Sequence, residues 1–572
     1  MQNIYKRMNK FYDAVGAHPF WCAFLICVGL TPLCFGAYQN ITDAALMMIC
    51  LVYIAVPCSG AVYYLKKKSG GKTDKMSLAA VLAGLLIAGF AVAKAFTSSQ
   101  HKVIWIFAGI ALPALLLRGL MMKDKKNSDR HTALMIMVIS FAIKFCYVLY
   151  TSVYTRQHDM GTFDTDRGHA GYIEYILKNR ALPDFDPRTK FQFYQPPLHH
   201  TVSAVWIYIC EEIFGVSRNF ARESLQMLML FYSAAVVIIV YKLLRHFGFS
   251  GKALLVPLAL FAFHPSYILS SGSINNDQLA CLLTVLAILL TMRWCKTPTT
   301  RNIIPIALAI GFAMMAKLNA GIIAPAVAIM FLWQFIKHKD EYVKFLKQFA
   351  VFGLVVVPPA LWWQIKNKLL YNMSYDYVPN VGMSHQYVGD DIFGRLTDFN
   401  PKQFSPVFEN FIQYGKDYDE YNPNVAILKN SLFDEFLDSS SFPGGTTFIP
   451  TILFWVAALL AIAAVVLTFV LVFKKDTKLP AYAKVFFVSY WTVSMYYFYV
   501  FCYLYPNTCT QNFRYISPLL VVGVVQYAML FDLLEKGEET RLKKVCSATL
   551  TAAVSLFCVL SVATYLLLGW AS

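Results

Sequence analysis

The sequence predicts an all-α protein that crosses a membrane many times. Apolar residues, counting Ala, Val, Ile, Leu, Met, Phe, Trp, Tyr and Cys, make up 58% of the 572 positions, and charged residues only 15%. Soluble domains have about 45–50% and about 25% of these classes. Apolar runs long enough to cross a hydrocarbon core of about 30 Å recur along the chain. They are continuous rather than alternating, which excludes a transmembrane β-barrel.

The formal net charge of +17 does not indicate a nucleic-acid partner. Lys and Arg lie in short clusters between apolar runs, as in membrane proteins, and build no basic face. The cysteines lie mostly inside apolar runs without metal-ligand spacing, so no redox or zinc motif is predicted. Basic residues precede the first apolar run without a clean cleavage site, which predicts a retained span with a cytoplasmic start.

The candidate spans follow from the apolar runs in order, each bounded by polar or basic residues. They are 18–37, 43–65, 76–97, 102–121, 131–153, 196–215, 225–243, 253–270, 277–294, 302–316, 319–336, 346–367, 448–473, 482–504, 512–532 and 545–569. Basic clusters at 66–75 and 123–130 follow the second and fourth spans, and both lie inside if the N-terminus does. The fifth span then delivers residues 154–195 to the outer side.

Full crossing by every later segment would place the remaining basic loops on the outer side. One non-crossing segment among the three that follow the first outer loop returns all of these loops to the inside. We therefore predict about 15 crossings with the C-terminus outside. The three candidate segments are 196–215, 225–243 and 253–270, and the basic loops lie around Arg293, Lys337, Lys474 and Lys536.

This topology divides the chain into four parts. Residues 1–125 hold almost no charge within their spans and are predicted to be an accessory four-span bundle. Residues 126–369 form the core and include the first outer loop, 154–195. Residues 370–447 form a second outer loop, which is acidic and rich in Pro, Asn and aromatic residues and is therefore predicted to be an ordered cap. Residues 448–572 supply the last spans.

The first outer loop carries more Asp, His and aromatic residues than a solvated loop needs. Asp159, Asp164 and Asp166 follow the membrane exit, and the amphipathic segment 169–178 predicts a helix along the membrane surface. Pro196-Pro197 then starts the next helix, where missing N–H donors cost nothing. The alternative is a solvated loop with paired charges.

These features resemble the GT-C superfamily of polyprenyl-phosphate-sugar-dependent glycosyltransferases, in particular the protein O-mannosyltransferases and the lipid A aminoarabinose transferase. FYQPPLHH (193–200) resembles the aromatic-Pro-Pro-Leu helix start of the family, and SGSINNDQLACLLTVLAILL (271–290) its Asp-headed span. The turn at 317–319 and FRYISPLL (513–520) resemble its later turn and its Arg-Tyr helix. The resemblance covers about residues 131–530 and leaves out the four N-terminal spans.

The resemblance implies sugar transfer from a polyprenyl-phosphate donor to a hydroxyl of a glycan, lipid or protein on the outer face. A hydroxyl is a poor nucleophile, so a carboxylate of the first outer loop would take its proton as general base. The leaving group is already a phosphate, which needs cations rather than an acid, and Arg can engage two of its oxygens. The protein would lie in the plasma membrane, or in the endoplasmic reticulum membrane of a eukaryote.

Asp159 and Asp166 are both candidates for the catalytic base. Asp159 is better fixed by its distance from the span end. Asp166 is in register with the family's catalytic Asp when counted back from the surface helix, and Asp164 ranks behind both.

The sequence requires no cofactor, but it leaves open whether the reaction uses a divalent metal ion. The family usually has an acidic residue directly after this Asp, and here Met160 and Arg167 stand in those places. A cluster of His158, His169 and His199 is a possible metal site.

The donor phosphate is expected at the outer ends of several spans. Arg514 begins a span with Tyr515 beside it, and the alternative for Arg514 is a simple helix anchor. Asp277 heads another span, where its alternative role is a helix N-cap. His200 stands where the O-mannosyltransferases carry Lys, which weakens that part of the match. The other candidate donor-binding residues are Arg156, His169, His199 and Lys317.

Two readings outside enzymology compete with transfer. A transporter or lipid flippase would place charged sites near the bilayer midplane, whereas most ionisable residues here lie at the outer boundary. A non-catalytic sensor or assembly subunit would explain the acidic second loop but not the Asp-rich first one. A phosphatase or ligase acting on lipid-linked glycans is the remaining enzymatic alternative.

Overall fold

The protein is all-helical in the part of the chain that its computed structural model describes. Apart from two isolated β-bridges, no strand occurs in these residues, and the predicted all-α class is confirmed. The predicted span 43–65 lies outside them. The described residues are 18–35, 75–97, 101–120, 128–379, 386–400, 421–538 and 540–571.

The apolar runs form helices close to the predicted places. Ten helices among the described residues are long and apolar enough to cross a membrane. The ten contain α5 (Lys102–Leu120), α6 (Ser128–Leu149), α10 (Leu225–His246), α13 (Asp277–Lys296), α15 (Ala324–Lys337), α16 (Tyr342–Tyr371), α19 (Phe448–Val470), α20 (Ala481–Leu504), α21 (Leu520–Glu535) and α22 (Arg541–Leu568). Four further helices have shorter apolar stretches: α2 (Pro19–Phe35), α4 (Lys75–Thr97), α11 (Lys252–Ala262) and α14 (Thr300–Ala316).

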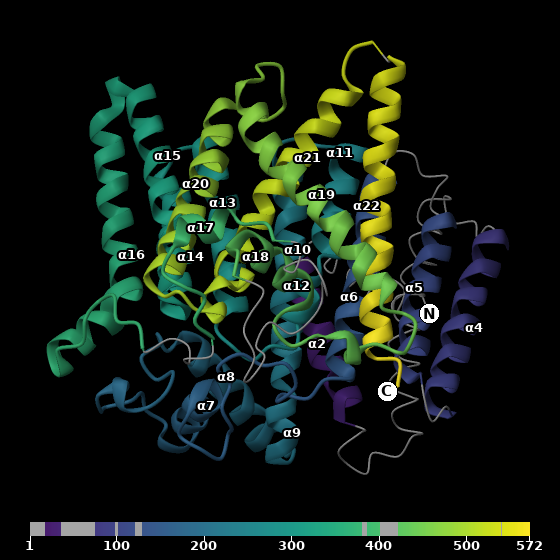
Figure 1. Cartoon of the computed structure of the whole chain (residues 1–572), viewed down its shortest axis with the longest axis horizontal. Helices are drawn as coiled ribbons and strands as arrows, with labels where there is room; N and C mark the ends of the chain where they lie inside the picture. Colours follow the sequence, from purple (N-terminus) through teal and green to yellow (C-terminus); the bar gives the residue numbers. More distant parts are fainter. Residues whose placement is uncertain are drawn as a thin grey trace, which may run out of the picture.

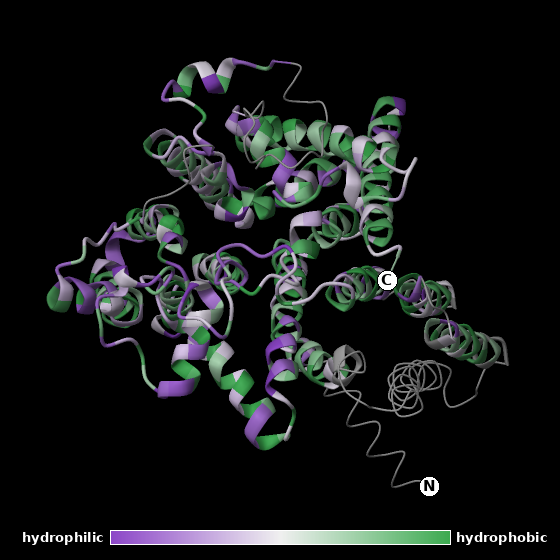
Figure 2. Cartoon of the chain, turned by 60° about the horizontal axis from the view of Figure 1, so that its bottom comes forward, coloured by the Kyte–Doolittle hydropathy of each residue, from purple (hydrophilic) through white to green (hydrophobic). Residues whose placement is uncertain are grey.

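Short helices gather at one end of the molecule or between the long ones. In Figure 1, α7, α8 and α9 lie at the bottom, whereas the hairpins α15–α16, α19–α20 and α21–α22 turn at the top. Figure 2 brings the bottom forward and shows many hydrophilic residues in its loops and short helices. The short helices are α7 (Gly168–Asn179), α8 (Leu198–Tyr208), α9 (Arg218–Glu223), α12 (Pro265–Leu269), α17 (Ile392–Thr397) and α18 (Pro423–Phe433).

The three hairpin turns at the top carry the basic loops near 337, 474 and 536. The first outer loop, which contains α7, lies at the opposite end, as the positive-inside arrangement requires. The total number of crossings stays a prediction.

Three segments are candidates for the one that does not cross the membrane, and their helices differ in length and continuity. Helix α8 has 11 residues and continues only as a π-helical turn, Ile209–Ile213, before Gly215 takes a positive φ of 66°. Helix α10 has 22 residues, and α11 is prolonged by α12 beyond a break at His264. Since α8 also packs against α7, we expect 196–215 to be the segment that does not cross, and this stays a prediction.

Burial separates central from peripheral helices. The spans containing α10, α13 and α21 are 78%, 72% and 72% buried within the protein, whereas the span of α16 is 22% buried. Exposed leucines such as Leu354 and Leu369 lie on α16, as expected of a surface that meets lipid. Of the central helices, α13 begins at Asp277, and α21 follows the 3₁₀ segment that contains Arg514.

Cysteine labelling tests this arrangement. Cysteines replacing Thr162, Ser440 and Thr477 should divide into two classes with a membrane-impermeant maleimide on intact cells. Thr162→Cys and Ser440→Cys should label from outside, and Thr477→Cys only after permeabilisation, because Thr477 lies in a basic turn. Labelling of Thr477→Cys on intact cells would contradict the topology.

Candidate active site

The first outer loop folds back in a tight turn just before α7. Thr162 forms a single antiparallel bridge with Arg167, and Gly161 and Gly168 have φ values of 62° and 74°. A Cβ at Gly161 would lie 2.0 Å from the carbonyl oxygen of Arg167. Glycine is therefore required for the two strands of the turn to approach this closely.

Asp164 and Asp166 lie at the tip of this turn and project into solvent. Asp164 is 78% exposed and pairs with Arg222 at 2.9 Å, and Asp166 is 64% exposed and pairs with Lys190 at 2.9 Å. Both partners lower the pKa of these carboxyls. Neither Asp lines the cavity described below.

Asp159 lies at the start of the turn and faces the interior of the outer end. Its φ of 56° is in the left-handed region, and its carbonyl oxygen accepts from the N–H of His169 at 3.0 Å. The N-terminus of α7 therefore helps to fix the backbone on which the carboxylate sits. Both terminal nitrogens of Arg514 donate to Asp159 Oδ2 at 3.2 Å.

The charge of Asp159 is favoured by its surroundings. Burial raises the pKa of its carboxyl, but the positive charges of Arg514, His158 and Lys317 outweigh burial and bring the pKa below its usual value. The side chain is still 33% exposed. Asp159 is thus an ionised carboxylate that a second molecule can reach.

Asp277 and Lys317 extend this pair into a chain of alternating charges. Lys317, between α14 and the 3₁₀ turn Leu318–Ile323, bonds to Asp277 Oδ1 at the start of α13. Arg514 Nη1, in the 3₁₀ segment Phe513–Leu519, lies 3.6 Å from Asp277 Oδ2. The Asp277 side chain faces these cations, and Asn276 occupies the N-cap position of α13.

Tyr515 and a cavity complete this group. The Tyr515 ring lies 5.0 Å from Lys317 Nζ and 5.0 Å from Arg514 Cζ, within cation–π range, and its hydroxyl accepts from Arg514 Nη2 at 3.1 Å. A small, partly open pocket is lined by Asp277, Lys317, Arg514 and Tyr515. Other parts of its wall are apolar, with Ile323 among them.

Three histidines predicted to bind the donor or a metal pack together between α7 and α8. His169 Nδ1 and His200 Nε2 share a hydrogen bond of 2.9 Å, and the His200 ring stacks on Tyr172 at 4.1 Å. Burial is the main cause that lowers the pKa of both imidazoles well below its usual value, so they are neutral at physiological pH. A neutral imidazole does not hold a phosphate by charge.

His199 and Arg156 form no hydrogen bond with the ion-pair chain among the described residues, although Asp277 is near enough for its charge to act on His199. Both ring nitrogens of His199 are buried without a hydrogen-bond partner among the described residues, and the same is true of Arg156 Nη1. Of the residues predicted to bind the donor, the structure therefore brings Arg514, Asp277 and Lys317 together with Tyr515.

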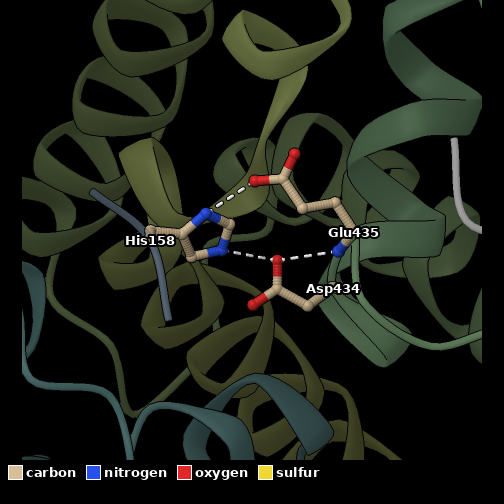
Figure 3. A group of neighbouring side chains, drawn as sticks. All are labelled: His158, Asp434 and Glu435. Carbon is tan, nitrogen blue, oxygen red and sulfur yellow. Dashed lines mark hydrogen bonds and ion pairs between the residues drawn. The ribbon is translucent and has the colours of Figure 1, made fainter. Parts of the chain in front are cut away.

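His158 is held by two carboxylates of the second outer loop (Figure 3). Its Nε2 lies 2.7 Å from Asp434 Oδ1, and its Nδ1 lies 2.6 Å from Glu435 Oε1. This corrects the expected cluster of His158 with His169 and His199, because the ring of His158 is occupied on both sides by acids.

The donor atoms of His158, Asp434 and Glu435 all lie within 4.8 Å of one another, a spacing at which a metal ion could be held. Each ring nitrogen, however, faces a different carboxylate at hydrogen-bond distance. A cation could take only one of these nitrogens, and would have to replace the hydrogen bond there. The arrangement fits an imidazolium between two carboxylates, and it also fits a divalent cation held by Nε2 and Asp434, with Glu435 accepting from the other ring nitrogen.

The charge of His158 agrees with the imidazolium arrangement. Burial lowers the pKa of the imidazole, as does the charge of Arg514, but Asp434 and Glu435 outweigh both and raise the pKa to about 9. At neutral pH both ring nitrogens therefore carry protons and donate.

Asp434 and Glu435 were not predicted from the sequence. They are two of many acids in the second outer loop, and their contact with His158 joins residues 276 positions apart. Their one distinguishing sign is that they directly follow a helix, α18, in the last part of the loop before α19.

Comparison with known proteins agrees with the sequence motifs. Residues 199–363 match the family model described as dolichyl-phosphate-mannose-protein mannosyltransferase. This segment includes the Asp277-headed span and the Lys317 turn. No curated protein matches the chain at a significant level.

Two solved structures show distant likeness. The Archaeoglobus fulgidus oligosaccharyltransferase, in a complex with Zn and sulfate, has 16% identity and a TM-score of 0.42 over 76% of this chain and 53% of that one. ArnT from Cupriavidus metallidurans, bound to undecaprenyl phosphate, has 13% identity and a TM-score of 0.33 over 75% of this chain and 77% of that one. The chain thus spans about half the length of the oligosaccharyltransferase. Through the segment 199–363, the chain resembles the GT-C superfamily of membrane glycosyltransferases, as its sequence motifs predict.

Proposed function

We propose that the protein transfers a sugar from a polyprenyl-phosphate donor to an acceptor hydroxyl on the outer face of the membrane. The observation that carries this proposal is the alternation of Asp159, Arg514, Asp277 and Lys317, the last three of which line a pocket with partly apolar walls. Such a site offers a carboxylate base beside two cations, with apolar side chains next to the cations.

The cations would hold the donor phosphate. Arg514 and Lys317 are only 16% and 12% exposed, so a phosphate between them exchanges its water for protein charge. The Arg514 fork can engage two phosphate oxygens, whereas Lys317 acts as a point charge. The apolar wall near Ile323 suits the first units of the prenyl chain.

Asp159 would be the general base. Its low pKa makes it a weak base while Arg514 donates to it. A phosphate that draws Arg514 and Lys317 toward itself removes part of that stabilisation, so donor binding raises the pKa of Asp159 and strengthens it as a base. The acceptor hydroxyl loses its proton to Asp159 as its oxygen attacks the anomeric carbon, and polyprenyl phosphate leaves.

Removing the base tests the catalytic role. Asp159→Asn should lower transfer by about 10²–10⁴-fold, the usual contribution of a general base. Binding of polyprenyl phosphate should not weaken, because Arg514 loses a competing carboxylate. The measurement is release of polyprenyl phosphate from a panel of labelled polyprenyl-phosphate hexoses and pentoses, with an extract of the host envelope as acceptor.

Asp166→Asn is the matched control on the same loop, since Asp166 is exposed and pairs with Lys190. It should transfer at the wild-type rate. Normal turnover by Asp159→Asn together with loss in Asp166→Asn would move the base to Asp166, and normal turnover by both would exclude a first-loop base.

The phosphate site is tested by a charge-conserving change. Arg514→Lys keeps the charge but loses the fork that spans Asp159 and Tyr515. We expect affinity for polyprenyl phosphate to fall about 10- to 100-fold, corresponding to one charge-assisted hydrogen bond of about 1.5–3 kcal/mol.

Titration of the purified proteins with polyprenyl phosphate in detergent micelles measures this change. Arg188→Lys, at an exposed arginine paired with Asp186, is the control and should bind normally. Wild-type affinity in Arg514→Lys would make Arg514 a helix anchor.

A further inference from the structure

Asp434 accepts three hydrogen bonds on a single oxygen. Its Oδ1 receives His158 Nε2 at 2.7 Å, Asn512 Nδ2 at 3.2 Å and the backbone N–H of Glu435 at 2.9 Å. His158 and Asn512 belong to segments far apart in the sequence, so one carboxylate ties two segments together.

Each of these segments leads directly to one member of the ion pair. His158 immediately precedes Asp159. Asn512 Oδ1 accepts from the backbone N–H of Arg514 at 2.9 Å, so the same side chain that bonds to Asp434 also holds the backbone of Arg514. Asp434 thus bonds to the residue before Asp159 and to the side chain that holds the backbone of Arg514.

The helix that carries Asp434 is itself firmly docked. Asn430 Oδ1, in α18, accepts from the N–H of Phe513 at 2.7 Å, and Asn430 Nδ2 donates to the carbonyl of Gln511 at 3.4 Å. The hydroxyl of Tyr565, in α22, donates to the carbonyl of Leu432. Asp434 then takes a left-handed φ of 53°, which turns the chain at the end of α18.

Glu435 completes the hold on His158. Figure 3 shows the two acids on neighbouring sides of the ring, each facing a different nitrogen. Glu435 is 5% exposed, so its bond to Nδ1 at 2.6 Å is shielded from water. With both nitrogens engaged, the ring cannot rotate without losing a charge-assisted bond.

We propose that Asp434 is a positioning residue that sets the placement of Asp159 relative to Arg514, with Glu435 locking the ring through which it acts. This inference rests on the proposed function, since it assigns a role to the second outer loop in the same reaction. Asp434 itself stays behind His158 and Asn512 and touches neither donor nor acceptor.

Two substitutions separate placement from simple stability. Asp434→Ala removes the bonds to His158 and Asn512, and should lower kcat by about 10²-fold with little change in donor KM, the size expected when a reacting group is misplaced by about 1 Å. Asp434→Asn keeps an acceptor oxygen and should restore much of kcat.

Asp438→Ala is the matched control. Asp438 lies in the same loop, and its carboxylate bonds to Ser440 and Ser441 within the next turn. Its kcat and donor KM should equal those of the wild type. Wild-type kcat in Asp434→Ala would overturn the proposal.

Hydrogen exchange gives a readout that needs no substrate. Peptides covering 153–163 should exchange faster in Asp434→Ala than in Asp438→Ala, while peptides of α10 stay unchanged. Equal exchange in the first-loop peptides of both variants would also overturn the proposal, even if Asp434→Ala proved too unstable to assay.

Parallel measurements distinguish this inference from the proposed function. If Asp159→Asn is inactive and Asp434→Ala is normal, the positioning role fails alone; if Asp159→Asn is fully active, the catalytic assignment fails first. Chelation could abolish the activity of the wild type, and added Zn²⁺ could restore it in the wild type but not in Asp434→Asn. That result would make His158, Asp434 and Glu435 a metal site and would overturn the positioning role of Asp434.

Discussion

The outer end of the molecule is organised around one largely buried guanidinium, Arg514. A charge removed from water must find partners in the protein, and Arg514 obtains them from Asp159 in the first outer loop and Asp277 at the head of α13. Lys317 then satisfies the second oxygen of Asp277. Loops that would otherwise be independent are tied together by the need to compensate this charge.

The fold and part of the site follow from local sequence, because their causes are local. A bilayer core offers no hydrogen bonds to the backbone, so long apolar runs have to be helical wherever they cross. Asp277, Lys317 and Arg514 each lie at the end of such a run, and a common outer side was enough to predict that they share one region.

The remaining features depend on contacts that no local pattern encodes. Residues 196–215 are apolar enough to predict a span, yet α8 ends at Tyr208 and only a π-helical turn separates it from the left-handed Gly215. Asp166 matches a family register but is carried outward by a turn that requires two glycines. The bond between His158 and Asp434 depends on how α18 docks, which composition does not reveal.

The charges of the group formed by Asp159, Asp277, Arg514 and Lys317 cancel, and this balance has a consequence for turnover. A polyprenyl-phosphate sugar is a phosphodiester with one negative charge, whereas the polyprenyl phosphate left after transfer is a monoester with about −1.5 to −2 charges at pH 7. The departing lipid is therefore attracted to Arg514 and Lys317 more strongly than the incoming one. Under the proposed function, the spent lipid is held more tightly than the incoming one, and it inhibits the enzyme where the membrane removes it slowly.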